Sequence, residues 1–237
     1  MTNSHFSHTP VLVQNIQTRF RNIQTMIPVP ESVPILKKMY SYESHSMHGQ
    51  LPIIWDRAEG FQVYDPYGNI WIDFTSTIFV ANAGHGNKRI IDALKKQLEK
   101  PLLHTYTYAN QERINYLEYL IENTPKQFEK AFLLSAGTEA TEATLKLMRL
   151  NGQKKGKRKG GVVCFDGAFH GRTLGAQMMT GSASAREWIG FEDPSMHHLP
   201  FPYPWTEGVS DPKQFFEDSI SQLIKEKGID PDEDLCG

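Results

Sequence analysis

Residues 135–140 (Ser-Ala-Gly-Thr-Glu-Ala) contain the residue types that bind a phosphate group. They join an apolar run, residues 131–135, to a helical pattern over residues 138–150, so they fall at the start of a helix. The backbone N–H groups there have no partner within the helix and carry about half a positive charge, which stabilises an anion. Gly137 would let the backbone approach the anion, and the Thr138 hydroxyl would add a donor. Taken alone, the pattern is also typical of an ordinary capped helix.

A second segment, residues 166–173 (Asp-Gly-Ala-Phe-His-Gly-Arg-Thr), follows the next predicted strand, residues 161–165. Because ligands of open α/β sheets bind at the carboxyl ends of the strands, we expect both segments at the same edge of the sheet. Phe169 can stack on a flat ring, and Arg172 can hold a carboxylate through two parallel hydrogen bonds. A loop with a core phenylalanine and a surface arginine explains this segment equally well on its own. Together, the two segments favour a flat, phosphorylated ligand, and pyridoxal 5′-phosphate fits that description.

With these two segments the chain resembles the class III aminotransferases, which have fold type I of the pyridoxal-phosphate enzymes. The family's hallmarks are a Ser-Gly-Thr-Glu-Ala turn and a Gly-Ala-(Tyr/Phe)-His-Gly-Arg-Thr loop. The resemblance runs from about residue 60 to the helix near residue 227. It includes, in the family's order, Val63-Tyr64-Asp65 with Gly68, Ile72-Asp73-Phe74 and Ala83-Gly84-His85. The chain departs from the family where Ala136 replaces the usual glycine and Phe169 replaces a frequent tyrosine, a change that keeps stacking but removes a phenolic hydroxyl.

The resemblance implies a cofactor role for four residues. Gly137 and Thr138 match the residues that bind the phosphate of pyridoxal 5′-phosphate through backbone and hydroxyl groups. Phe169 matches the aromatic ring stacked on the pyridine, and His170 after it is expected to shape the loop.

The resemblance also implies two substrate-binding residues. In the ω-amino-acid branch of the family, the arginine matching Arg172 binds the substrate carboxylate, and Ile78 matches an apolar wall of the pocket. The family's Schiff-base lysine and its carboxylate partner of the pyridinium nitrogen match no residue before Gly237. We therefore predict no catalytic residue within this chain, and we expect the chain alone to be inactive and to be the front part of a larger protein.

The elements that must position these residues begin with an antiparallel part. The first fifty residues are polar and contain a short predicted helix over residues 33–39, as in an arm that wraps a surface. Residues 60–74 form two alternating runs on either side of an Asp-Pro-Tyr-Gly-Asn turn, which predicts a β-hairpin. Two amphipathic helices are predicted after it, over residues 87–100 and 111–123.

An alternation of strands and helices follows. Predicted strands at 131–135, 161–165 and 196–201 alternate with helices that include 138–150 and 212–227, which indicates an α/β fold with a mainly parallel sheet and flanking helices. Only about three strands appear, whereas sheets usually have about five or six, so we expect fold type I to be incomplete here. The expected division is residues 1–85, arm and hairpin of a small domain, and residues 86–237, the start of the large cofactor-binding domain.

Composition is that of an ordinary soluble protein. The chain has 237 residues, 39% of them hydrophobic, and its 25 Lys+Arg nearly balance 27 Asp+Glu, which argues against a surface built for nucleic acid. Two cysteines cannot form a disulfide framework, and no window approaches the roughly 18 apolar residues of a membrane helix. These features favour a cytoplasmic protein without a membrane or nucleic-acid partner.

A basic segment, an acidic segment and a pair of histidines are expected to have no binding or catalytic role. The basic residues 154–159 and the acidic residues 230–234 are expected to be solvated loops. His197 and His198 have no cysteine or carboxylate at metal-ligand spacing, so no metal site is predicted.

The predicted function is that of a pyridoxal-phosphate-dependent aminotransferase, which moves an amino group from an amino acid or ω-amine donor to a 2-oxo acid. The resemblance also implies a homodimer. Alternatives are an amino-acid epimerase or racemase on the same scaffold, and a non-catalytic remnant that binds a phosphorylated ligand or pairs with a longer subunit. A nucleic-acid-binding module using residues 154–159 is a further alternative.

Overall fold

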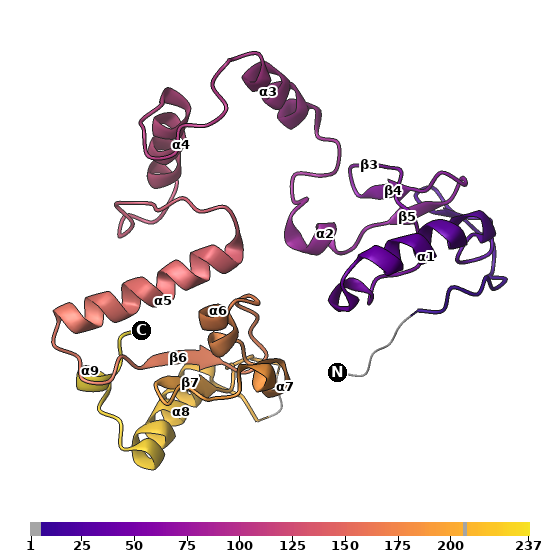
Figure 1. The fold of residues 1–237 in the computed structure, drawn as a ribbon. Coiled ribbons are helices and arrows are strands. Elements are labelled where there is room, and N and C mark those ends of the chain that lie inside the picture. The colour runs from indigo at the N-terminus through magenta and orange to yellow at the C-terminus, as the bar shows by residue number, and fades with distance from the viewer. Residues whose placement is uncertain (1–5, 206–207) are drawn as a thin grey trace. The chain divides into compact units, whose positions relative to one another are not determined.

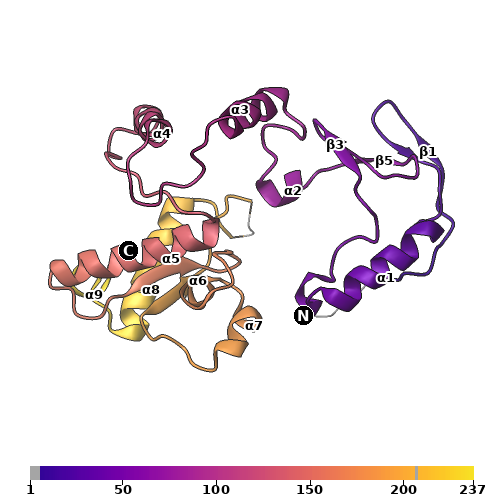
Figure 2. The same cartoon turned by 45° about the horizontal axis from the view of Figure 1, so that its top comes forward.

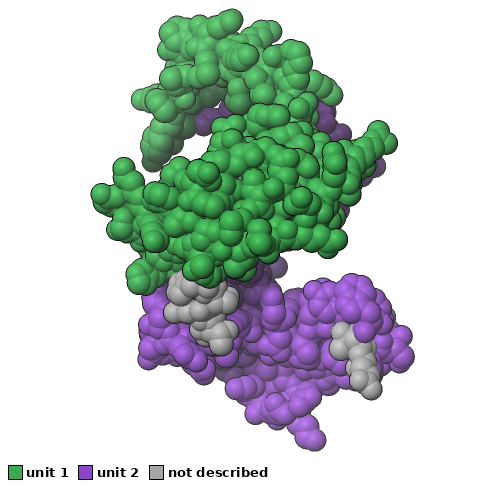
Figure 3. All heavy atoms as spheres, turned by 90° about the vertical axis from the view of Figure 1, so that its right-hand side faces the viewer, with its two compact units in different colours: residues 1–110 green, residues 111–237 purple. Residues whose placement is uncertain are grey.

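The computed structural model describes residues 6–205 and 208–237. The chain divides after Asn110 into two compact units, which Figure 3 colours separately. Each unit is described here by itself. The sequence-based division after residue 85 concerns the domains of a complete enzyme and stays a prediction.

The first unit contains an antiparallel sheet. Within the described residues the sheet has five strands in the order β1-β2-β5-β4-β3. The strands are β1 (Ile16–Gln17), β2 (Asn22–Ile23), β3 (Arg57–Glu59), β4 (Gln62–Tyr64) and β5 (Ile70–Ile72). The predicted hairpin is confirmed, because β4 and β5 pair with Val63 opposite Trp71. The Asp65 carboxylate closes its turn by accepting the N–H groups of Tyr67 at 2.9 Å and Asn69 at 2.8 Å.

The N-terminal arm joins this sheet, which the sequence did not predict. Residues 16–23 form a hairpin whose second strand pairs with β5 through Asn22 and Ile70. The fully buried Asn69 links turn and arm, since its amide donates to the Thr25 hydroxyl at 2.8 Å and its carbonyl accepts the Gln24 N–H at 2.9 Å. This part of the expected arm thus pairs with the sheet, because its backbone completes the ladder on one side of β5.

The predicted helices of the first unit are present. They are α1 (Val33–Tyr42) and α3 (Lys88–Leu98), accompanied by the short α2 (Ser76–Phe79) and by 3-10 turns at Pro30–Ser32 and His45–Met47. Asn87 starts α3, because its side-chain oxygen accepts the N–H of Arg89 at 3.1 Å and of Ile90 at 3.4 Å.

The second unit is an α/β layer. Its elements are α4 (Gln111–Glu122), α5 (Gly137–Lys154), β6 (Val162–Phe165), α6 (Leu174–Met179), α7 (Ala183–Arg186), a 3-10 turn (Glu187–Ile189), β7 (Met196–Leu199), α8 (Pro212–Lys227) and α9 (Pro231–Asp234). Strands β6 and β7 are parallel, with Cys164 opposite His198. Figures 1 and 2 show α5 on one face of this pair and α8 on the other.

The alternation of side chains along β6 builds a core on both faces. Val162 and Cys164 pack with Leu145 of α5 and Met179 of α6. The intervening residues Val163 and Phe165 pack on the other side, in a cluster with Leu199, Leu223 and Ile229. Since successive side chains of a strand point to opposite faces, a strand apolar at every position indicates helices on both sides. This arrangement confirms the predicted α/β fold class.

A third parallel segment borders β6. Gly161 bridges Leu235, the Cys236 N–H donates to the Gly161 carbonyl at 2.7 Å, and the Val163 N–H donates to the Gly237 carbonyl at 2.8 Å. The sequence analysis assigned no strand to residues 235–237, whose composition gives no strand signal.

The predicted strand at residues 131–135 is absent from the described part of the chain. Phe132 is 71% exposed, and Leu133 and Leu134 are 39% and 40% exposed. An apolar run becomes a strand only when a neighbouring strand takes its hydrogen bonds, and no described segment pairs with this run. The turn at residues 135–140 thus leads from irregular chain into α5.

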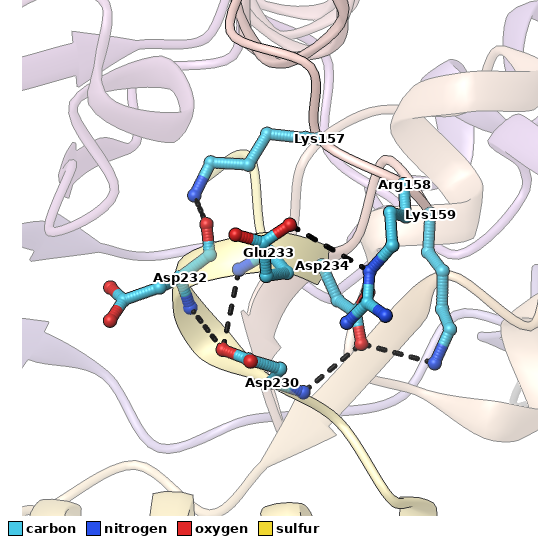
Figure 4. A network of polar contacts seen from close by, with 7 residues as sticks. All are labelled: Lys157, Arg158, Lys159, Asp230, Asp232, Glu233 and Asp234. Carbon is cyan, nitrogen blue, oxygen red and sulfur yellow. Dashed lines mark hydrogen bonds and ion pairs between the residues drawn. The ribbon is translucent and has the colours of Figure 1, made fainter.

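The basic and acidic segments pair with each other instead of being solvated separately. Figure 4 shows this charge cluster, residues 157–159 facing residues 230–234. Lys159 Nζ lies 3.0 Å from Asp234 Oδ2, an Arg158 guanidinium nitrogen lies 3.2 Å from Asp234 Oδ1, and Lys157 bonds the Asp232 carbonyl.

The Asp234 side chain is only 1% exposed. A hydrogen bond from the Asp230 N–H lowers the pKa of Asp234, and Lys159 and Arg158 lower it further against the effect of burial. The expectation of two solvated loops was therefore wrong.

Among the described residues, no helix combines the length and the apolar character needed to cross a membrane.

Candidate functional site

The first turn of α5 presents unpaired backbone donors. Ala136 before it is extended, with φ −147° and ψ 160°, and the first hydrogen bond of the helix runs from the Ala140 N–H to the Ala136 carbonyl at 3.1 Å. Within the described chain no acceptor meets the N–H groups of Gly137 and Thr138. Gly137 is exposed, and no atom lies within 4 Å of the position that its Cβ would take. An anion can therefore approach this backbone directly.

The loop at residues 166–173 packs against this helix start. A Cβ at Gly171 would lie 2.6 Å from Thr138 Oγ1 and Cγ2, and Gly171 has φ +136°. Only glycine fits there, because a side chain would collide with Thr138 and the backbone conformation is one that other residues rarely adopt. The structure thus brings the two predicted segments together, with Thr138 and Gly171 in contact.

The predicted ligand-binding side chains of the loop are accessible. Phe169 is 70% exposed, and Arg172 is exposed and forms no ion pair with any described residue. His170 is half-buried, and its backbone is tied on both sides. The Thr141 hydroxyl donates to its carbonyl at 2.7 Å, and its N–H donates to the Thr180 hydroxyl at 3.2 Å. The ring and the guanidinium are free to meet a ligand, while the backbone of His170 is fixed.

One residue of this region was missed by the sequence analysis. Glu142 of α5 accepts hydrogen bonds from the Thr173 hydroxyl and, at 3.0 Å, from the Ala176 N–H. Burial raises the pKa of Glu142, but these bonds and one from the Gly175 N–H outweigh that effect, so the pKa is lowered. Its spacing was a usable signal, because residues four apart lie on the same face of a helix and Glu142 follows Thr138 by four.

Ile78 belongs to the first unit, where it sits in a left-handed turn. Ser76, Thr77, Ile78 and Phe79 have φ values of 48°, 53°, 58° and 67°. Ile78 is 68% exposed, so its side chain is available to a ligand. Its predicted role as a pocket wall stays a prediction.

Asp73 holds this turn. Its carboxylate accepts the Thr75 N–H at 2.8 Å, the Thr75 hydroxyl at 2.6 Å and the Thr77 N–H at 3.1 Å, and it lies 2.8 Å from His85 Nε2. Burial raises the pKa of Asp73, but the bonds from Thr75, His85 and Thr77 prevail and lower it from 3.8 to about 2. A carboxylate that accepts several hydrogen bonds is stabilised in its ionised form.

A cavity in the second unit lies apart from the predicted residues. It has a volume of about 660 Å³, and its lining includes Arg186, Asp193, His197, His198 and Lys227. Burial lowers the pKa of His197, and the nearby Lys227 lowers it further. Burial also lowers the pKa of His198, and there the second cause is Arg186. In the part of the chain that the structure describes, no three His, Cys, Asp or Glu side chains are grouped to hold a metal ion.

Comparison with protein families gives a match over most of the chain. Residues 43–232 match the family described as aminotransferase class-III. The acetylornithine aminotransferase of Aquifex aeolicus is 33% identical over 183 residues, which cover 76% of this chain and 44% of that protein. The acetylornithine aminotransferase of Clostridium acetobutylicum is 36% identical over 144 residues, 59% of this chain and 36% of that protein.

Solved structures share the fold. The taurine:2-oxoglutarate aminotransferase of Bifidobacterium kashiwanohense, in complex with PLP and glutamate, superposes with a TM-score of 0.71 at 21% identity, over 86% of this chain and 46% of that one. An omega-aminotransferase from Paracoccus denitrificans gives a TM-score of 0.68 at 22% identity, over 81% and 46%. The chain spans less than half the length of each of these proteins.

Proposed function

This chain belongs to the class III aminotransferase family, and from that premise we propose that it carries part of the cofactor site of a pyridoxal-phosphate-dependent aminotransferase. The observation that carries the proposal is the contact between Thr138, at the free start of α5, and Gly171, in the loop that presents Phe169. A phosphate donor set and an exposed aromatic ring are thereby carried by two segments in contact with each other.

The residues present fit the cofactor. The N–H groups of Gly137 and Thr138 and the Thr138 hydroxyl bind its phosphate, where the start of α5 stabilises negative charge. Phe169 stacks on its ring, and the fixed backbone of His170 holds Phe169 in place. When bound, pyridoxal phosphate supplies the electron sink of the reaction. Gly171 excludes solvent between loop and helix, because it packs directly on Thr138.

The proposed substrates are an amino donor with a carboxylate and a 2-oxo acid acceptor. Arg172, exposed and without an ion pair in the described chain, binds the carboxylate through two parallel hydrogen bonds, and Ile78 forms an apolar wall. Relatives named for acetylornithine and ornithine support an ω-amino acid as the donor. A structural neighbour named for taurine and 2-oxoglutarate supports a 2-oxo acid as the acceptor.

We place this enzyme in the cytoplasm as a homodimer. The two cysteines are free, which suits a reducing compartment. The complete protein is expected to divide into a small domain that includes residues 1–85 and a large cofactor-binding domain that begins at residue 86.

The experiment is an assay of the protein isolated from its natural source. It is incubated with pyridoxal phosphate, N-acetylornithine or ornithine, and 2-oxoglutarate, and glutamate formation is measured. We expect glutamate only when donor and acceptor are both present. Racemisation of an amino acid without an acceptor would instead identify an epimerase or racemase. Absence of both reactions and of bound cofactor would contradict the proposal.

A further inference from the structure

We propose that Glu142 is a positioning residue that sets the Phe169 loop against the phosphate-binding start of α5. The inference deepens the proposed function and rests on it. Glu142 lies on α5 and acts on the far end of the loop at residues 166–173, through Thr173.

One face of α5 carries the contacts. Thr141 and Glu142 follow Thr138 by three and four residues, so both lie on the same face of the helix as Thr138. Thr138 contacts Gly171, Thr141 bonds the His170 carbonyl at 2.7 Å, and Glu142 bonds Thr173 and the Ala176 N–H. The helix that begins the phosphate site therefore also holds the loop from its middle to its end.

The carboxylate is matched to the backbone that it holds. Ala176 and Gly175 lie in the first turn of α6, where free N–H groups favour a negative charge. A side chain at Gly175 would collide with the Glu142 carboxylate, so glycine at this position lets the carboxylate reach the backbone. The half-buried carboxylate accepts bonds from three donors, the Thr173 hydroxyl and the N–H groups of Ala176 and Gly175.

The loop is also tied at its other end. The Gly181 N–H donates to the Ala168 carbonyl at 2.8 Å, immediately before Phe169. Phe169 thus projects from a short span whose two flanks are fixed, one by Gly181 and the other by Thr141 and Glu142. Loss of the Glu142 bonds releases the end of the loop at Thr173, while the bonds of His170 to Thr141 and Thr180 and the N–H groups of Gly137 and Thr138 stay in place.

The test separates ring binding from phosphate binding. The probes are inorganic phosphate and pyridoxamine 5′-phosphate, which has no aldehyde and cannot react with surface lysines. Dissociation constants of both probes are measured for the full chain and for Glu142→Ala, Glu142→Gln and the control Glu226→Gln. Glu226 is an exposed acid of α8 that accepts one hydrogen bond, from Gln222 at 2.8 Å.

We expect Glu142→Ala to raise the dissociation constant of pyridoxamine 5′-phosphate about tenfold, because hydrogen bonds to a charged group are lost. The dissociation constant of inorganic phosphate should stay nearly unchanged. Glu142→Gln keeps one acceptor oxygen, so its dissociation constant for pyridoxamine 5′-phosphate should be intermediate. Glu226→Gln should bind both probes as the unchanged chain does. The phosphate arm also reports whether each variant is folded.

Two results would overturn the inference alone. One is binding of pyridoxamine 5′-phosphate to Glu142→Ala with unchanged affinity. The other is an equal loss for both probes, which would show that Glu142 supports the fold and not the position of the loop. Failure of the unchanged chain to bind either probe would overturn the proposed cofactor site together with the inference.

Discussion

The loop at residues 166–173 and the turn at residues 73–80 both present predicted ligand-binding side chains, but different contacts hold their backbones. The loop is held by residues far away in the sequence, since Thr141 bonds His170 and Glu142 bonds Thr173 across about thirty positions. The turn is held mainly by Asp73, which bonds residues two and four positions later.

This difference shows that tertiary packing holds the backbone of the loop, whereas local side-chain bonds hold the backbone of the turn. Because Thr141 and Glu142 of α5 bond the loop, we expect changes on α5 to be felt in the loop. Most bonds of the turn are local, and Asp73 also bonds two more distant residues, since its carboxylate lies 2.8 Å from His85 Nε2 and its N–H donates to the Phe61 carbonyl at 2.9 Å. Each segment is nevertheless held in part by one carboxylate with a lowered pKa, Glu142 for the loop and Asp73 for the turn.

The largest effect is expected at the contact between loop and helix. Gly171→Ala should lower the free energy of unfolding by about 3 kcal/mol, because it adds backbone strain to a collision with Thr138. The matched control is Gly167→Ala, with φ +77° but open space around its Cβ position, which should cost about 1 kcal/mol. Urea unfolding of the three chains measures both losses. Equal losses would show that the packing of Gly171 on Thr138 contributes nothing.

A smaller effect is expected in the turn. Asp73→Asn should lower the free energy of unfolding by about 1–2 kcal/mol at pH 7, because the amide cannot accept all of the bonds that the carboxylate accepts. The pKa of Asp73 is about 2 in the folded chain and 3.8 ordinarily, so its ionised form stabilises the fold above pH 3.8. That stabilisation is lost as the pH falls from 3.8 to about 2.

The stability difference between the unchanged chain and Asp73→Asn should therefore shrink over this pH interval, as measured by urea unfolding at pH 2, 3, 4 and 7. The control is Asp92→Asn, an exposed acid paired with Lys88 at 2.5 Å, which should change stability little at any pH. A difference for Asp73→Asn that stays constant with pH would contradict the role of its charge.

The smallest effect is expected in the charge cluster of Figure 4, which holds neither segment. Lys159→Gln should lower stability less than Asp73→Asn, because Lys159 is 54% exposed and water screens its pairing with Asp234. Urea unfolding at low salt and at 1 M NaCl should show the loss only at low salt. Lys154→Gln, outside the cluster, is the control. A loss that persists at 1 M NaCl would indicate packing instead of charge.

Local patterns in the sequence predicted the helices and the hairpin well. The periodicity of residues 87–100 gave α3, and the Asp-Pro-Tyr-Gly-Asn turn gave β4 and β5. The same reasoning failed at residues 131–135, because an apolar run does not reveal whether a partner strand is present. It also missed residues 235–237, whose pairing with β6 is set by a contact across more than seventy positions.

The residues of the candidate site likewise fall into those that the sequence predicted and one that it did not. Gly137, Thr138, Phe169 and Arg172 were found from residue type and from family resemblance, and the structure brings their two segments into contact. Glu142 was missed although its spacing from Thr138 places both on one helix face, because its partners lie about thirty residues later and the folded chain is what shows that they meet.

The most direct test of the cofactor site is an NMR titration of the full chain with pyridoxamine 5′-phosphate. We expect saturable shifts of the Gly137 and Thr138 amide resonances and of the Phe169 ring, because phosphate and ring bind there together. Resonances of His197 and His198, which line the separate cavity, should stay unchanged. Shifts confined to that cavity, or no shifts at Gly137, Thr138 and Phe169, would contradict the account.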